Sequence, residues 1–266
     1  MASSLALHHV TALAGNAQRN LDFYKRIPGL KLVKRTVNFD DPGSHHLYFG
    51  AGDGTPGTLL TFFPWATPAN PNGRPGVRGS GQISAVTVRA AVEADDPPAD
   101  PDGIAIQFTA GESPRLQSVT LCEADSAPTI AFFRDVLGLE AGGDNRVQLA
   151  DGAWIEVQHS PGTPRGKMGA GIIHHFAMRV ADEEAQLAWR EKLIRAGVRV
   201  SAVRDRLYFH SIYFREPGGV LLEIATDGPG FLIDEPRGRL GGRLCLPPWL
   251  EPARQGIERR LPEMAI

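Results

Sequence analysis

The chain repeats one pattern of strands and a helix along its length. Residues 20–30 (NLDFYKRIPGL) resemble residues 129–139 (TIAFFRDVLGL), at an offset of 109 residues (129 minus 20). Both segments place apolar residues at a helical period and end near a glycine, which is typical of an amphipathic helix with a left-handed terminus. Strand-like runs precede them at 7–13 and 116–122, and short strand-like runs follow them. The repeat therefore predicts a chain of βαβββ modules.

Another complete copy lies near the C-terminus. Its first strand is expected at 172–180 (IIHHFAMRV) and its helix at 183–197. Three strands are expected after the helix, at 198–203 (VRVSAV), 207–214 (LYFHSIYF) and 219–225 (GVLLEIA). This copy aligns with the first at an offset of 166 residues (175 minus 9), which superimposes the two His-His pairs.

A shortened copy lies between the first two helical segments. Residues 81–90 and 104–110 are typical of strands, but residues 91–103 (AVEADDPPADPDG) hold too much proline and aspartate for a helix. We therefore expect an α+β fold of four tandem βαβββ modules, the second of them abbreviated. These modules should pair into two open mixed-sheet barrels.

The repeat also predicts how the chain divides. Residues 1–113 should hold the first module and the abbreviated second, and residues 114–226 the two C-terminal modules. Residues 227–266 are rich in glycine and proline and should form a tail that wraps over the surface. Of the 266 residues, 42% are hydrophobic, which is enough for a sizeable core.

Charge and cysteine content narrow the classes of partner. The formal net charge is -2 without a basic patch, so nucleic acid is not an expected partner. No apolar stretch approaches the roughly 20 residues that span a bilayer, and the N-terminus does not resemble a secretory signal. The two cysteines, Cys122 and Cys245, lie far apart without CxxC spacing. A reducing cytoplasm is therefore the expected location.

The module alignment singles out four equivalent positions where a metal could bind. The second histidine of each His-His pair gives His9 and His175, and a late position on the last strand gives Thr61 and Glu223. Two imidazoles and one carboxylate form a facial triad, which suits non-haem Fe(II) and leaves faces open for substrate and O₂. Manganese accepts the same ligands, so Mn(II) stays possible.

Two other functional classes remain open at this point. A metal-dependent isomerase or lyase would use Zn²⁺ or Ni²⁺ with a second carboxylate ligand, and Thr61 stands where that ligand would be. A non-catalytic binder of small molecules such as antibiotics needs no triad. The preserved set of two histidines and one glutamate favours an enzyme that uses Fe(II) and O₂ over the isomerase or lyase and over the non-catalytic binder.

Other polar residues are interpreted as structural. Glu156 occupies the Glu223 position of the third module, but Ser118 stands in place of the histidine there. We expect Glu156 to be exposed or in a salt bridge. His45 and His46 have no partner carboxylate nearby in sequence and are expected to be structural, with substrate entry as the alternative.

Three segments resemble a known superfamily. They are LHHVTALAGNAQRNLDFYKRIPGL, GIIHHFAMRVADEE and EPGGVLLEIATDGPGF, and they resemble the vicinal-oxygen-chelate (glyoxalase/bleomycin-resistance/dioxygenase) superfamily. The tail segments DGPGFLIDEP and LGGRLCLPPWLEPARQGIERRLP are similar to the hydroquinone-type ring-cleaving dioxygenases of that superfamily. The resemblance covers nearly the whole chain, although family members usually keep a fuller second module.

The resemblance implies an Fe(II)-dependent extradiol-type enzyme that cleaves the ring of a hydroquinone or catechol with O₂. It also implies a homo-oligomer. Matched residue by residue, the family's pattern implies metal ligands at His9, His175 and Glu223, catalytic residues at Tyr213, His174 and Arg206, and substrate-binding residues at His8 and Thr11.

Overall fold

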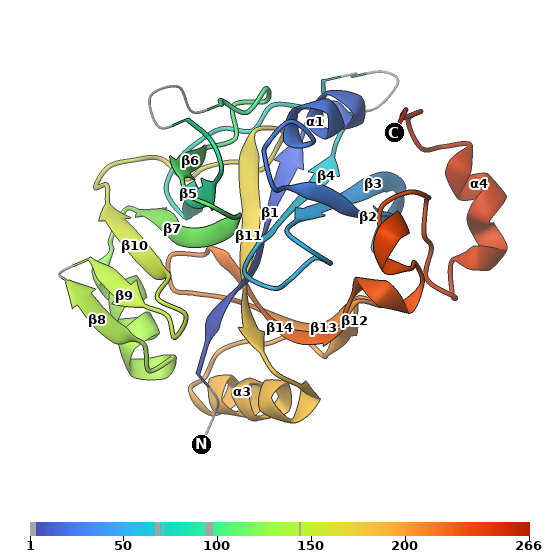
Figure 1. Ribbon diagram of the computed structural model, residues 1–266. Helices are drawn as coiled ribbons and strands as arrows, with labels where there is room; N and C mark the ends of the chain where they lie inside the picture. The colour runs from blue at the N-terminus through green and yellow to red at the C-terminus, as the bar shows by residue number, and fades with distance from the viewer. Residues whose placement is uncertain (1–3, 67–69, 71, 94–97, 144) are drawn as a thin grey trace.

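The computed structural model describes residues 4–66, 70, 72–93, 98–143 and 145–266, and its chain forms one mixed sheet with few helices (Figure 1). Fourteen strands belong to this sheet. Its main path runs β2-β3-β4-β1-β11-β5-β7-β10-β9-β8, and β6 and β12–β14 pair beside it. The predicted α+β architecture of tandem modules is confirmed.

The first module has the expected order. Its helix begins earlier than residue 20 because the Asn16 side chain accepts a hydrogen bond from the Arg19 amide and caps it. Leu21 and Tyr24 lie on its buried stripe, and Gly29 follows its end at a φ of 83°. The elements are β1 (Ala6–Ala14), α1 (Ala17–Tyr24), β2 (Lys31–Asn38), β3 (Asp41–Gly50) and β4 (Leu59–Pro64).

The second module keeps two strands, as predicted. Between them, the described residues 91–93 and 98–103 form no helix, and residues 94–97 lie outside the described part of the chain. The third module is complete, but its helix continues as a π-helix before Gly138. Their elements are β5 (Gln82–Ala90), β6 (Ile106–Ala110), β7 (Arg115–Glu123), α2 (Ala127–Ala131), η1 (Phe132–Val136), β8 (Glu140–Gly143), β9 (Arg146–Gln148) and β10 (Trp154–His159).

The fourth module differs from the expectation in one strand. Residues 198–203 are not a strand; in their place a short β12 pairs with β13, and Ser201 contributes one backbone bond to Tyr213. Val198 and Val200 are partly buried against the core, whereas Val203 is exposed, so the alternation reflects packing without strand pairing. The elements are β11 (Ile172–Val180), α3 (Glu183–Arg195), β12 (Arg204–Asp205), β13 (Phe209–Arg215) and β14 (Leu221–Pro229).

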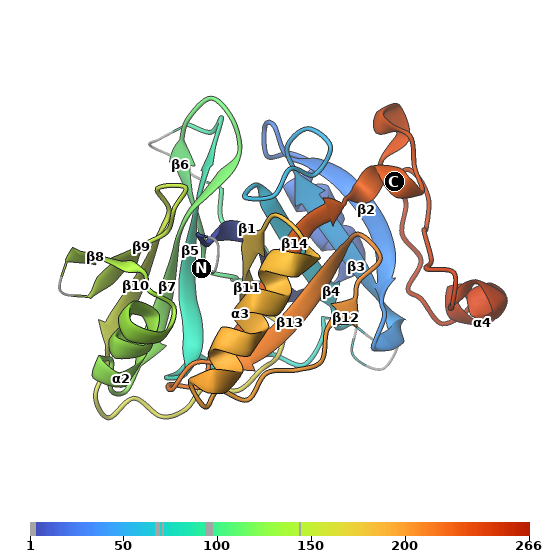
Figure 2. The same cartoon turned by 90° about the horizontal axis from the view of Figure 1, so that it is seen from below.

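The first module pairs with the fourth, and the second with the third. Strands β1 and β11 are antiparallel neighbours in the middle of the molecule, and each pairs in parallel with the last strand of its own module (Figure 1). Helix α3 packs on β11, β13 and β14 (Figure 2). None of the helices in the described residues is both long and apolar enough to cross a membrane.

The C-terminal tail lies over the first module, beside β2 in Figure 1. The fully buried Lys34 on β2 holds it, because its ammonium group lies 2.5 Å from carboxylate oxygens of both Asp234 and Glu235. The Cys245 amide also donates to the Arg35 carbonyl. The helical turns of the tail are η2 (Phe231–Ile233), η3 (Arg237–Arg239), η4 (Glu251–Ala253) and α4 (Arg254–Glu258).

One buried acid at the end of β7 predicts a pH-dependent stability. Burial raises the pKa of Glu123 from 4.5 to about 7, and the Glu216 carboxylate acts in the same direction. The folded chain therefore holds a proton that the unfolded chain releases near pH 4.5, and this stabilisation is lost as pH rises through about 7. Between pH 5.5 and 8.5 the loss is expected to be about 2 kcal/mol.

Glu123→Gln should remove this loss. The difference in urea unfolding free energy between wild type and variant, measured with chelator present, should shift by about 2 kcal/mol in favour of the variant from pH 5.5 to pH 8.5. A difference that does not change with pH would show that Glu123 does not titrate in this range.

Candidate metal centre

Three predicted ligands from three neighbouring strands lie together on one face of the sheet. In the strand register, Ala177 on β11 lies opposite His9 on β1 and opposite Glu223 on β14. His175 lies two residues from Ala177 on the same strand and therefore on the same face. The methyl group of Ala177 is small, so the row leaves space between the larger side chains.

The three donor atoms have the separations that one bound ion requires. The Glu223 Oε2 atom lies 2.9 Å from His175 Nε2 and 3.4 Å from His9 Nε2, and the two Nε2 atoms are 3.4 Å apart. Donors bound at about 2.1 Å, with angles of about 90–110°, lie about 3.0–3.4 Å apart. All three residues are buried, and Glu223 Oε2 makes no well-aligned hydrogen bond to the described residues. These residues therefore fit a divalent metal ion.

The electrostatics keep these groups ready to bind a cation. Burial alone would raise the pKa of Glu223, but the imidazoles of His9 and His175 hold it well below its ordinary value. Burial lowers the pKa of His175. A carboxylate and a neutral imidazole are the forms that ligate metals. The second carboxylate oxygen of Glu223 accepts a hydrogen bond from the Ser211 hydroxyl, which orients the group.

Two β-bulges explain why the histidines occur in pairs. Between Leu7 and His9, β1 advances two residues while β11 advances one, so His8 is the extra residue; His174 is the extra residue of the corresponding bulge in β11. Each bulge brings neighbouring rings together, with Nδ1 atoms 2.9 Å apart in the first pair and 2.7 Å apart in the second. A regular strand would place them on opposite faces.

These contacts select the tautomer of each ligand. Burial lowers the pKa of His8 and that of His174 to about 3, so both rings are neutral and can accept a hydrogen bond at Nδ1. His9 and His175 then carry their proton on Nδ1 and leave Nε2 free for the metal; the tautomers follow from the network. In this arrangement, His8 orients His9 and His174 orients His175.

Removing the partner ring should weaken metal binding. His8→Phe keeps the ring volume but leaves the His9 Nδ1–H without its acceptor, so metal affinity is expected to fall about 10-fold to 100-fold. Competition with a chromophoric chelator measures this change. His159→Phe, at a histidine on β10 that is not among the described cavity-lining residues, is the control and should bind as wild type does. An unchanged affinity for His8→Phe would remove His8 from the site.

The triad opens into a cavity of about 300 Å³. Its volume suits one small molecule rather than a polymer. The walls are largely aromatic and come from the first and fourth modules, and Trp65, which is 38% exposed, is part of the lining. The lining residues are His9, Thr11, Leu13, Asn38, Phe39, Asp40, His46, Tyr48, Phe63, Trp65, His174, His175, Arg206, Phe209, Tyr213, Leu221 and Glu223.

A threonine occupies the place of a fourth ligand. Thr11 of the first module is equivalent to Ala177 of the fourth, since their numbers differ by 166 (177 minus 11). The register pairs Thr11 with Thr61 and Ala177 with Glu223, so Thr61 stands where a second carboxylate would reach the metal. Its hydroxyl lies 2.8 Å from the Thr11 hydroxyl. Among the described residues, the group of metal-ligating side chains at this site has three members.

The cavity lining also contains a hydrogen-bonded group formed by Arg206, Tyr213 and Asp40. Arg206 Nε donates to the Tyr213 hydroxyl at 3.1 Å, and Arg206 Nη2 lies 2.8 Å from Asp40 Oδ2. Burial raises the pKa of Tyr213, and the charge of Glu223 raises it further, so the phenol keeps its proton at neutral pH. The Tyr213 ring lies 6.0 Å from the His175 ring, beside the metal ligands.

The predicted site residues are not all placed alike. Thr11, His174, Arg206 and Tyr213 line the cavity, whereas His8 is not among its described lining residues and contacts His9 instead. Glu156 forms a salt bridge of 2.9 Å with Arg146, which confirms that expectation.

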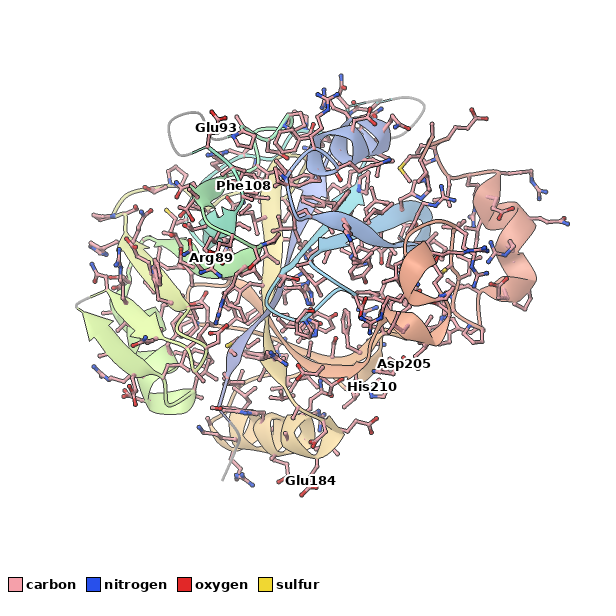
Figure 3. All side chains as sticks on the ribbon, in the orientation of Figure 1. Arg89, Glu93, Phe108, Glu184, Asp205 and His210 are labelled. Atoms are coloured by element: carbon pink, nitrogen blue, oxygen red, sulfur yellow. The ribbon has the colours of Figure 1, made fainter. Side chains whose placement is uncertain are left out.

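Two histidines depart from the sequence interpretation. His46, which was expected to be structural, lines the cavity. It lies on β3, which pairs with β4, the strand of Thr61, and this pairing could not be predicted from spacing along the chain. His210, which the strand-like run LYFHSIYF indicates to be a core histidine, with a pocket wall as the alternative, instead lies at the surface near Asp205 (Figure 3), and its Nδ1 is 2.8 Å from Glu183 Oε1.

The chain is similar to known proteins along most of its length. Residues 115–224 match the model of the family described as "Glyoxalase/Bleomycin resistance protein/Dioxygenase superfamily". The chain is 39% identical to the "Putative ring-cleaving dioxygenase MhqO" of Bacillus subtilis (strain 168), over 97% of this chain and 96% of that protein. It is 30% identical to the chlorohydroquinone/hydroquinone 1,2-dioxygenase of Sphingobium indicum, over 96% of this chain and 95% of that protein.

Solved structures show the same fold. A crystal structure described as a "putative dioxygenase" from Bacillus subtilis subsp. subtilis str. 168 is 36% identical and superimposes with a TM-score of 0.90, covering 100% of this chain and 99% of that one. Glyoxalase I from Zea mays has a TM-score of 0.62 at 15% identity, covering 84% of this chain and 93% of that one, and so shares the fold alone.

Proposed function

The chain belongs to the glyoxalase/bleomycin resistance protein/dioxygenase superfamily, and from that membership and the site geometry we propose that it is a ring-cleaving dioxygenase with one divalent metal ion, Fe(II). The observation that carries the proposal is a buried triad of His9, His175 and Glu223 that faces an aromatic cavity with Thr61 at the fourth position. Such an open face allows a diphenol and O₂ to bind side by side.

The proposed substrates are a hydroquinone or a catechol. Relatives at 30–39% identity are named ring-cleaving and hydroquinone dioxygenases, and they match this chain over at least 96% of its length. The cavity of about 300 Å³ is large enough for a single substituted ring. Its aromatic side chains can stack on such a ring or meet it edge to face.

When bound, the metal supplies a site where the substrate oxygen and O₂ exchange electron density, so that the ring opens beside a hydroxyl. The protein orients the substrate and excludes water from this site. Phe39, Tyr48 and Phe209 form apolar walls that exclude water from the ring. Tyr213 holds a proton next to the ligands and is positioned to donate it to oxygen, while Arg206 fixes the direction of its hydroxyl.

His174 has two roles in this proposal. Its Nδ1 accepts a hydrogen bond from His175 Nδ1–H, and the rest of its ring lies in the cavity wall, within reach of a bound substrate. Because burial lowers its pKa to about 3, the ring stays neutral and carries its proton on Nε2, which can donate a hydrogen bond to a substrate oxygen. The homo-oligomer that the family resemblance implies stays a prediction.

The rival isomerase function is less well supported. The fold is shared with glyoxalase I of maize, but a glyoxalase-type reaction is expected to use a second carboxylate, and Thr61 provides a neutral hydroxyl at that position. A non-catalytic binder would not need three buried ligands at coordination distance.

Oxygen uptake tests the proposal. The protein should be loaded anaerobically with Fe(II) and then given O₂ with a panel of hydroquinones and catechols. We expect O₂ consumption in equal amount to a ring-opened product, and none after chelation. No uptake across the panel, together with turnover of a hemithioacetal by the Zn²⁺ form, would favour the isomerase instead.

A further inference from the structure

One polar side chain of the cavity is not used by the function proposed above. His46 projects from β3 between two aromatic rings, with its ring centre 4.0 Å from that of Tyr48 and 4.1 Å from that of Phe63. Its Nε2 lies 3.0 Å from the Thr61 hydroxyl. These three contacts fix the ring in one orientation at the edge of the open metal face.

The remaining nitrogen of His46 is available to a ligand. Among the described residues, no hydrogen bond to its Nδ1 occurs, and this atom is not one of the fully buried polar atoms that lack a partner. The ring is part-buried and lines the cavity. A substrate in the cavity can therefore reach Nδ1, while Nε2 is already satisfied.

Because it contacts the Thr61 hydroxyl, which in turn contacts the Thr11 hydroxyl, His46 can act as either a hydrogen-bond donor or an acceptor at its other ring nitrogen. Thr11, Thr61 and His46 form a chain of contacts of 2.8 Å and 3.0 Å. If Thr61 accepts from Nε2, then Nδ1 is an acceptor for a hydroxyl group; if the chain runs in the other direction, Nδ1 is a donor to an oxygen atom. Burial lowers the pKa of His46 well below its ordinary value, so the ring stays neutral and keeps both options.

Two other polar groups of the cavity are already assigned. Arg206 is paired with Asp40 and donates to the Tyr213 hydroxyl oxygen, and the proposed function assigns the Tyr213 proton to oxygen beside the metal ligands. A diphenol that places one hydroxyl on the metal must bury the other, and a buried hydroxyl without a partner is unfavourable. His46 Nδ1 can satisfy it without breaking an existing contact.

We propose that His46 binds the substrate hydroxyl that is remote from the metal, and so makes the site prefer a 1,4-diphenol over a monophenol. This inference rests on the proposed function for the position of the first hydroxyl. It adds a specificity-determining residue that the spacing of residues along the chain did not indicate.

Ligand affinities without turnover test the proposal. Titration calorimetry on the Zn²⁺-loaded protein without O₂ gives dissociation constants for hydroquinone, phenol and catechol. We expect wild type to bind hydroquinone about 5-fold to 20-fold more tightly than phenol, because the second hydroxyl is bonded. Catechol, whose two hydroxyls both reach the metal, should not depend on His46.

Three substitutions separate the two ring nitrogens. His46→Phe keeps the packing between Tyr48 and Phe63 without a polar atom, and His46→Gln places an amide near Nε2. Both should bind hydroquinone and phenol equally well. His46→Asn places an amide near the Nδ1 position and should keep part of the preference. His159→Phe is the control and should match wild type.

The outcomes decide the proposal in each case. A preference for hydroquinone that persists in His46→Phe overturns it, as does a wild type that binds hydroquinone and phenol alike. If the variants do not fold, the ¹⁵N shift of His46 Nδ1 in wild type decides: it should move with hydroquinone and not with phenol, and an equal response to both overturns the proposal. These results do not depend on O₂ uptake, so a failure of the dioxygenase function is recognised separately.

Discussion

Glu223→Gln is expected to abolish ring cleavage while the chain still folds. The amide has almost the same shape as the carboxylate, but it removes the charge that draws a divalent ion between His9 and His175. We expect metal affinity to fall on the order of 100-fold or more. Turnover should then fall on the order of 1,000-fold or more, because the chemistry depends on the bound ion.

Glu156→Gln is the matched control for this variant. Glu156 occupies the equivalent strand position of the third module and forms a salt bridge with Arg146 at the surface. We expect wild-type metal content and turnover from it. The measurements are metal content after gel filtration, O₂ uptake, and thermal unfolding to confirm folding. Near-normal turnover by metal-loaded Glu223→Gln would contradict the assignment of the third ligand.

Thr61→Glu should also abolish ring cleavage, but with the opposite effect on metal binding. A carboxylate at this position is related to Glu223 by the pseudo-symmetry of the two modules and fills a fourth coordination site. Metal affinity should rise about 10-fold in the variant, and turnover should fall about 100-fold or more, because a face needed by substrate or O₂ is occupied.

Thr61→Val distinguishes this effect from a general disturbance of the pocket. It keeps the volume of threonine and removes only the hydroxyl that contacts Thr11 and His46. We expect the metal affinity of wild type and a turnover reduced by about 10-fold or less. Chelator competition and O₂ uptake measure both quantities. If Thr61→Glu turns over substrate like wild type, Thr61 does not stand beside the open face.

Much of the site could be predicted from the sequence because the modules repeat. Aligning the His-His pairs fixed the equivalence of His9 with His175 and of Thr61 with Glu223, and the strand register confirms it. The absence of a helix from the described residues of 91–103 followed from the proline and aspartate content of this segment. Neither prediction needed knowledge of how the strands are ordered in the sheet.

The other parts of the site and of the fold could not be predicted, because they depend on β-bulges and strand pairing that sequence periodicity does not indicate. The role of His8 depends on a β-bulge, which turns its ring toward His9 although the two are sequence neighbours. His46 joins the site because β3 pairs with β4, a contact between segments that the repeat does not align. Residues 198–203 alternate like a strand, but pairing is confined to the following residues of β12.

A crystal structure of the anaerobic Fe(II)-loaded protein, with anomalous differences collected at the iron edge, would locate the metal and its ligands. We expect one strong peak per chain, within bonding distance of His9 Nε2, His175 Nε2 and Glu223 Oε2, with the cavity side of the ion free of protein ligands. A peak elsewhere, such as beside Asp234, Glu235 and Cys245, or a fourth protein ligand at this site, would contradict the proposed metal site.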